Sequence, residues 1–123
     1  MLTYFETLVM RHLLATLGHA DSADELIASV RVVERFHSGV GVITVLAQRD
    51  LRVRLQGHQE PNAPAVVFSH PGLRHDGMAF LRVDTDGRIG SLEAFTFGSE
   101  VWPGDASREY VLRPDIAVQA ADP

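Results

Sequence analysis

The spacing of apolar residues changes once along this chain, and that change restricts the possible folds more than any other feature. Residues 2–17 place apolar side chains at helical spacing, as in Phe5, Val9 and Leu13. From Val32 onward apolar and polar residues alternate instead, which is typical of strands with one buried face. Helices followed by strands predict an α+β fold, because an α/β chain would alternate the two kinds of element.

The N-terminal quarter of the chain is expected to form two helices. Residues 2–17 make the first helix, and Gly18 is placed to end it in a left-handed conformation. Ser22 and Glu25 have the spacing of a capping box, in which a hydroxyl and a carboxylate satisfy two free backbone donors. A second, short helix is therefore predicted to begin at Ser22.

The rest of the chain is expected to form a sheet. Ser38-Gly39 and Asp84–Gly87 are turn signals, each between two alternating segments, so both predict hairpins. We expect two helices packed on one face of a twisted, mainly antiparallel sheet of about five or six strands. Residues 1–113 would form one domain, with 114–123 as a frayed tail. The predicted strands are 32–37, 40–47, 51–55, 65–69, 77–83, 88–97 and a short one within 108–113.

Composition removes several functional classes. The net charge is −5 and the 11 basic residues, all Arg, form no cluster, so nucleic acid is not the expected partner. The chain has no Cys, which excludes disulfides and thiolate chemistry. It has no apolar run of the ~20 residues that span a bilayer, and its first residues lack the features of a signal peptide. A cytoplasmic protein without membrane contact is expected.

The hairpin around Asp84–Gly87 divides its residues between two faces. Only a one-residue slip in register would mix the two sets. The first set is small and aliphatic, which suits a helix lying close to it, and contains Ala79, Leu81, Val83, Leu92, Ala94 and Thr96. The second set combines large apolar groups with charges in mid-strand, and contains Met78, Phe80, Arg82, Ser91, Glu93 and Phe95.

The second set has two interpretations. A solvated face rarely carries this many large apolar groups, and a buried core rarely holds unpaired charges, so this face is expected to line a groove or a self-association surface. The alternative is that Arg82 and Glu93 simply form a cross-strand ion pair, worth some tenths of a kcal/mol. A two-residue turn at Ser38-Gly39 also places Arg35 and His37 on one face, which we expect beside Arg82 and Glu93.

Two loops carry further candidates. His70 and His75, with Asp76, suggest a metal site, but their spacing is not specific, and solvent-facing histidines explain it as well. Trp102 is the single Trp of the chain and lies in a loop with Pro103. Its ring could anchor a partner, or it could fold back as a lid on the edge of the sheet.

Two blocks of the sequence resemble a family of small uncharacterised bacterial proteins. The family pattern has an F-x-G-x-G strand, a D-G turn, an L-E-G-Y-T-Y-type strand and a W-P loop, and the resemblance covers roughly residues 30–112. It rests on residues 36–44, 74–80, 86–87, 92–97 and 102–103. This chain differs from the pattern at Ala94, Phe95 and Phe97, so it lacks two hydroxyl groups. The resemblance implies a stand-alone bacterial domain and assigns no catalytic residue.

Together these observations predict a small non-catalytic protein that binds a protein partner or small ligand through the mixed face, without a cofactor. Self-association through this face would make it a homodimer. The alternative is a hydrolase-like enzyme in which Glu93 acts as general base beside Arg82 or His37. No catalytic or metal-binding residue is assigned. The candidate binding residues are Arg35, His37, Phe80, Arg82, Glu93, Phe95 and Trp102.

Overall fold

The protein has the predicted α+β fold, as a computed structural model that describes residues 1–49, 55 and 63–117 shows. Two helices precede the sheet, and all neighbouring strands are antiparallel. The helices are α1 (Tyr4–Thr16) and α2 (Ala23–Ser29). The strands are β1 (Val30–His37), β2 (Gly41–Gln48), β3 (Ala65–Ser69), β4 (Gly77–Val83), β5 (Ile89–Thr96) and β6 (Val111–Arg113).

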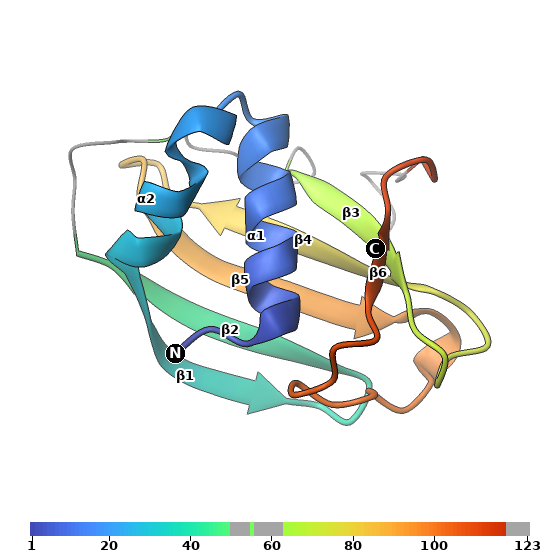
Figure 1. Ribbon diagram of the computed structural model, residues 1–123. Coiled ribbons are helices and arrows are strands. Elements are labelled where there is room, and N and C mark those ends of the chain that lie inside the picture. The colour runs from blue at the N-terminus through green and yellow to red at the C-terminus, as the bar shows by residue number, and fades with distance from the viewer. Residues whose placement is uncertain (50–54, 56–62, 118–123) are drawn as a thin grey trace.

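The six strands form one sheet in the order β1-β2-β5-β4-β3-β6. Both helices lie on the same side of it, with α1 crossing the central strands (Figure 1). The β1–β2 and β4–β5 hairpins meet where β2 pairs with β5, so the two hairpins form a continuous four-stranded region that runs from the β1 edge to β4. No helix among the described residues is long and apolar enough to cross a membrane.

The two helix starts differ from the prediction. Thr3 and Glu6 form a capping box at α1, with the Thr3 hydroxyl accepting from the Glu6 N–H at 3.1 Å and the Glu6 carboxylate from the Thr3 N–H at 2.9 Å. The capping box predicted at Ser22 is wrong, because that side chain makes no cap hydrogen bond. A 3₁₀ turn, Ala20–Ser22, leads into α2 instead. Gly18 has the expected left-handed conformation, with φ of 89°.

The core lies between the helices and the sheet. All six residues of the predicted aliphatic face are buried, which confirms how the sequence divides the β4–β5 hairpin. At one end of the core an aromatic cluster joins α1, β3 and the segment before β6. Phe5 is at its centre, with ring centroids 5.0 Å from Phe68, 5.5 Å from Trp102 and 4.4 Å from Tyr110.

The β1–β2 hairpin has a different turn from the one predicted. The Ser38 N–H donates to the Gly41 carbonyl at 3.1 Å, so Gly39 and Val40 are the central residues of the turn. Gly39 has a φ of 87°, which an L side chain rarely adopts. The register pairs His37 with Val42, a two-residue slip from the predicted one, so the predicted faces of this hairpin are preserved.

Two predicted segments lie largely outside the described residues. Of the predicted strand 51–55, only Leu55 is described; it is buried, and its N–H donates to the Gly87 carbonyl at 3.0 Å. Of the predicted frayed tail 114–123, residues 114–117 are described and form a turn in which the Ile116 N–H donates to the Arg113 carbonyl at 3.1 Å.

Candidate functional site

The sheet separates the predicted binding residues into two groups. Arg35 pairs with Thr44, which in turn pairs with Leu92, a residue of the helix-covered face. Arg35 and His37 therefore lie on the helix-covered side. The expectation that they lie beside Arg82 and Glu93 is wrong, because alternation within one hairpin does not determine which of its faces joins a given face of the other.

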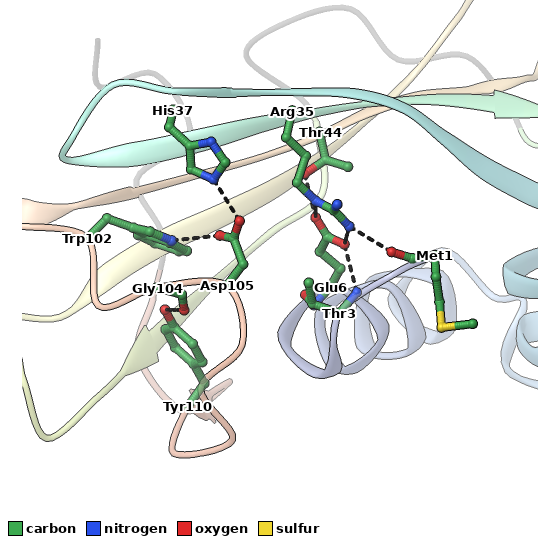
Figure 2. A network of polar contacts seen from close by, with 10 residues as sticks. All are labelled: Met1, Thr3, Glu6, Arg35, His37, Thr44, Trp102, Gly104, Asp105 and Tyr110. Atoms are coloured by element: carbon green, nitrogen blue, oxygen red, sulfur yellow. Dashed lines mark hydrogen bonds and ion pairs between the residues drawn. The ribbon is translucent and has the colours of Figure 1, made fainter.

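Arg35 belongs to a partly buried network with Glu6 and Thr44 (Figure 2). The guanidinium binds the Glu6 carboxylate at two points, Nε to Oε2 at 2.9 Å and Nη2 to Oε1 at 2.7 Å. The Thr44 hydroxyl donates to Oε2 at 2.5 Å, and Arg35 Nη2 also donates to the Met1 carbonyl at 2.8 Å. The network thus ties the start of α1 to β1 and β2.

Each oxygen of the Glu6 carboxylate accepts two hydrogen bonds, and Glu6 is only 2% exposed. Burial alone would raise the pKa of Glu6, but the hydrogen bonds from Arg35, Thr44 and the Thr3 backbone outweigh burial and lower it. A carboxylate whose pKa is lowered and whose oxygens each already accept two hydrogen bonds is not placed to accept a proton from a substrate. The network holds the fold together.

A second chain of polar contacts holds the Trp102 loop against β1. The Asp105 carboxylate binds His37 Nε2 at 2.6 Å and accepts from the Trp102 indole N–H at 2.9 Å (Figure 2). Trp102 is 9% exposed. Its ring is therefore folded back against the protein, as in the second of the two interpretations above. The nearby Tyr110 hydroxyl donates to the Gly104 carbonyl at 2.7 Å, and burial and the Asp105 charge raise the pKa of Tyr110.

The sequence reasoning missed Glu6 and Asp105, the two carboxylates of these networks. Glu6 had a signal: it falls three residues after Thr3 and within the apolar stripe of α1, where a charge needs a partner. Asp105 had none for its contact with His37, which lies 68 positions away in the sequence.

The loop histidines use their ring nitrogens within the protein. His70 Nδ1 accepts from the Gly72 N–H at 2.9 Å, and its Nε2 lies 2.7 Å from the Ser107 hydroxyl oxygen. His75 Nδ1 lies 3.4 Å from a Glu100 carboxylate oxygen. Among the described residues, no three His, Asp or Glu side chains are grouped so that they could hold a metal ion.

The other four predicted binding residues, Phe80, Arg82, Glu93 and Phe95, lie on the side of the sheet that faces away from both helices, here called the open face. The strand register arranges this face in rows. One row crosses five strands through Phe36, Ile43, Glu93, Phe80 and Ala65. The rows on either side pass through Glu34, Val45, Ser91 and Arg82, and through Gly41, Phe95, Met78 and Val67.

Large apolar side chains on the open face remain in contact with solvent. Phe36 is 52% exposed and Ile43 is 42% exposed. Phe97 continues the group beyond β5, where its ring makes an edge contact with Phe95 at 6.0 Å. Four of the chain's six phenylalanines thus lie on or beside this face, whereas only Phe5 and Phe68 are in the core.

Arg82 and Glu93 form an ion pair in the middle of the open face. The Arg82 side chain is 46% exposed and that of Glu93 is 17% exposed. The guanidinium also lies 5.6 Å from the centroid of the Phe80 ring. The predicted cross-strand pair is therefore present, and it leaves neither charge isolated among the apolar groups.

Comparison with known proteins found no match: no protein-family model, curated protein or solved structure is significantly similar to this chain.

Proposed function

We propose that this protein is a non-catalytic interaction protein that binds a protein partner through the open face of its sheet. The observation that carries the proposal is the exposure of Phe36 and Ile43 in a row that continues to Phe80. Leaving such groups in water costs about 25 cal/mol for each Å² that a partner could cover. Contiguous apolar patches of this kind typically mark sites of protein association.

The size of the apolar area favours a macromolecule over a small ligand. Phe36 lies on β1 and Phe80 on β4, which are separated by β2 and β5. With strands about 4.8 Å apart, these side chains extend over about 14 Å across the sheet. A small ligand is usually enclosed by a concave site with a few convergent polar groups, whereas this surface is spread over four strands.

The charges of the face are compatible with burial. The Arg82–Glu93 pair is already formed in the free protein, so a partner that covers it removes no charge from its counter-ion. In the alternative, Glu93 acts as a general base beside Arg82 or His37. His37 does not support it, because this residue lies on the opposite side of the sheet, bound to Asp105.

The proposal is tested by photo-crosslinking from single positions. A benzophenone amino acid replaces Phe36, and in a matched sample it replaces Tyr4, an aromatic residue of α1 that is 44% exposed on the helical side. The labelled proteins are irradiated in the cells that express them, and the adducts are resolved by mass. We expect a discrete protein adduct from Phe36 and none from Tyr4.

Equal labelling from both positions, or none from Phe36, would contradict the proposal. A second position on the same face, Ile43, gives an independent measurement, because it is 42% exposed and pairs with Phe36 across β1 and β2. Adducts from Phe36 and Ile43 should contain the same partner.

A further inference from the structure

We infer that the partner of the open face is a second copy of this chain, packed sheet to sheet about a two-fold axis. The inference rests on the proposed function and specifies its partner. Two such faces would lie about 10 Å apart, as in other packed sheets, with the apolar side chains of both copies interdigitated. A two-fold axis requires a surface that is complementary to itself, and two features of this face meet that requirement, while a third feature of the sheet disfavours association through its edges.

The first feature is charge balance. The whole chain has a net charge of −5, so two copies repel each other over most of their surfaces. The open face differs from the rest: on its β1, β4 and β5 strands the register places two residues of each sign, namely Arg31, Glu34, Arg82 and Glu93. On β6, Arg113 pairs with Asp115 at 3.4 Å. The described part of this face is therefore neutral.

The second feature is the central position of opposite charges. Arg82 and Glu93 lie on adjacent strands, so an axis passing near them would bring Arg82 of each copy towards Glu93 of the other. Each carboxylate could then accept from both guanidinium groups. A foreign partner would need a matching pair at the same spacing, whereas a second copy already has it.

The third feature is that both edges of the sheet are poor sites for strand pairing. β1 carries a bulge between Val32 and Glu34, with Val33 51% exposed, and β6 has only three residues. Bulges and short edge strands are the devices that prevent edge-to-edge association. Self-association through the face is thus favoured over extension of the sheet.

The available area is sufficient for a dimer. Four strands of seven or eight residues and two shorter ones give the face a projected area of about 600 Å², at about 4.8 Å between strands and about 3.4 Å per residue. Protruding side chains make the accessible area larger than its projection. The projected area alone thus matches the lower end, about 600 Å² per partner, of what specific interfaces bury.

The test uses two variants with opposite charge changes. Arg82→Glu leaves two acidic residues at the centre of the face, and Glu93→Arg leaves two basic ones. The mass of each species is measured by native mass spectrometry and by light scattering. We expect wild type at twice the 13.5 kDa of one chain, and each variant alone to associate about a hundredfold more weakly or worse. An equimolar mixture of the two should form the mixed dimer.

Arg11→Glu is the matched control, because it changes the net charge as Arg82→Glu does but lies on α1, on the helical side, with 57% of its side chain exposed. It should remain dimeric. Should circular dichroism show that either charge variant is unfolded, Phe36→Asp replaces the pair and is expected to be monomeric.

A monomeric wild type, a mixture that stays monomeric, or an equal loss in Arg11→Glu would overturn the inference. The crosslinking from Phe36 separates this failure from that of the proposed function. A monomer that crosslinks to a different protein leaves the interaction function in place, and a monomer without adducts removes both.

Discussion

Glu6 and Arg35, which are 29 positions apart in the sequence, form a two-point ion pair that attaches the first turn of α1 to β1. The carboxylate is almost fully buried, and the Arg35 side chain is 24% exposed. Because Thr44 binds the same carboxylate, three elements meet at this one group. The pair explains why a charge interrupts the apolar stripe of α1, and it makes the position of the helix on the sheet sensitive to a single residue.

Replacing Glu6 by Gln should destabilise the protein by about 2–4 kcal/mol. The substitution keeps the shape of the side chain but leaves the Arg35 charge without its counter-ion. Removing one member of a buried ion pair destabilises a protein more than replacing both members by apolar residues. Chemical denaturation of both proteins gives the difference in unfolding free energy. Arg11→Ala is the control: it breaks the exposed Arg11–Asp24 pair, at 2.8 Å, and should cost less than about 1 kcal/mol.

The contribution of Glu6 should depend on pH. Its pKa is lowered in the folded state, so the unfolded chain takes up a proton at a higher pH than the folded protein does. The stabilisation is therefore complete above about pH 5 and is lost as the pH falls through the lower, folded pKa. The difference in unfolding free energy between wild type and Glu6→Gln should be constant from pH 7 to 5 and shrink in more acid solution.

The pKa values of Glu100 and Asp115 are also lowered, by backbone hydrogen bonds from Arg74 and His75 and by Arg113, respectively. Both carboxylates are present in wild type and in Glu6→Gln, so their contributions cancel in the difference. A difference that stays constant down to about pH 3 would show that Glu6 is not the group responsible.

The two capping sequences should differ in their effect on stability. Thr3→Ala removes the acceptor for the Glu6 N–H and should cost about 1 kcal/mol. Ser22→Ala removes a side chain that makes no cap hydrogen bond and should cost less than about 0.5 kcal/mol. Urea denaturation of the two variants gives both values, and equal losses would contradict the assignment of the cap to Thr3.

Gly41 should not tolerate a side chain. A Cβ atom there would lie 2.3 Å from the Ala94 carbonyl oxygen and 3.0 Å from the Phe95 Cα, so β2 and β5 would have to separate. Gly41→Ala should therefore cost about 2–3 kcal/mol. Gly39→Ala is a useful comparison, because its Cβ would meet nothing within 4 Å and only its positive φ is unfavourable. In thermal denaturation, Gly41→Ala should have a lower melting temperature than Gly39→Ala.

Asp105→Ala should loosen the Trp102 loop. The substitution removes the acceptor of the indole N–H and the partner of His37, and a buried donor left without an acceptor costs about 1–3 kcal/mol. Trp102 is the single Trp, so its fluorescence reports on this loop alone, and its emission should shift to the red. Asp86→Ala, which removes a carboxylate that is 52% exposed, should leave the emission unchanged.

The two capping sequences also show where local patterns stop being informative. Both Thr3–Glu6 and Ser22–Glu25 match the motif. Thr3 has φ −77° and ψ 169°, the extended conformation from which a hydroxyl reaches the helix backbone, whereas Ser22 has φ −106° and ψ 2°. The 3₁₀ turn before α2 imposes this second conformation. The sequence alone could therefore locate both helices and both capping motifs, but it could not decide which motif forms a cap.

The predicted grouping of the candidate binding residues was correct for β4 and β5 but not for β1, for a similar reason. The alternation in β4 and β5 was sufficient to place Phe80 and Glu93 together on one face, because side chains alternate strictly along a strand. It was equally sufficient to place Arg35 and His37 on one face of the first hairpin. The pairing of β2 with β5 decides which face of the first hairpin lies on the same side of the sheet as a given face of the second. No turn connects those two strands directly.

The amino-acid sequence by itself determined the two helices, the antiparallel hairpins and the division of each hairpin into two faces, because these properties depend on residues within a few positions of one another. The tertiary structure decided the partners of Glu6 and Asp105, the burial of Trp102 and the side on which Arg35 and His37 lie. Those outcomes depend on the register between hairpins and on the packing of α1, which only the close approach of distant segments establishes.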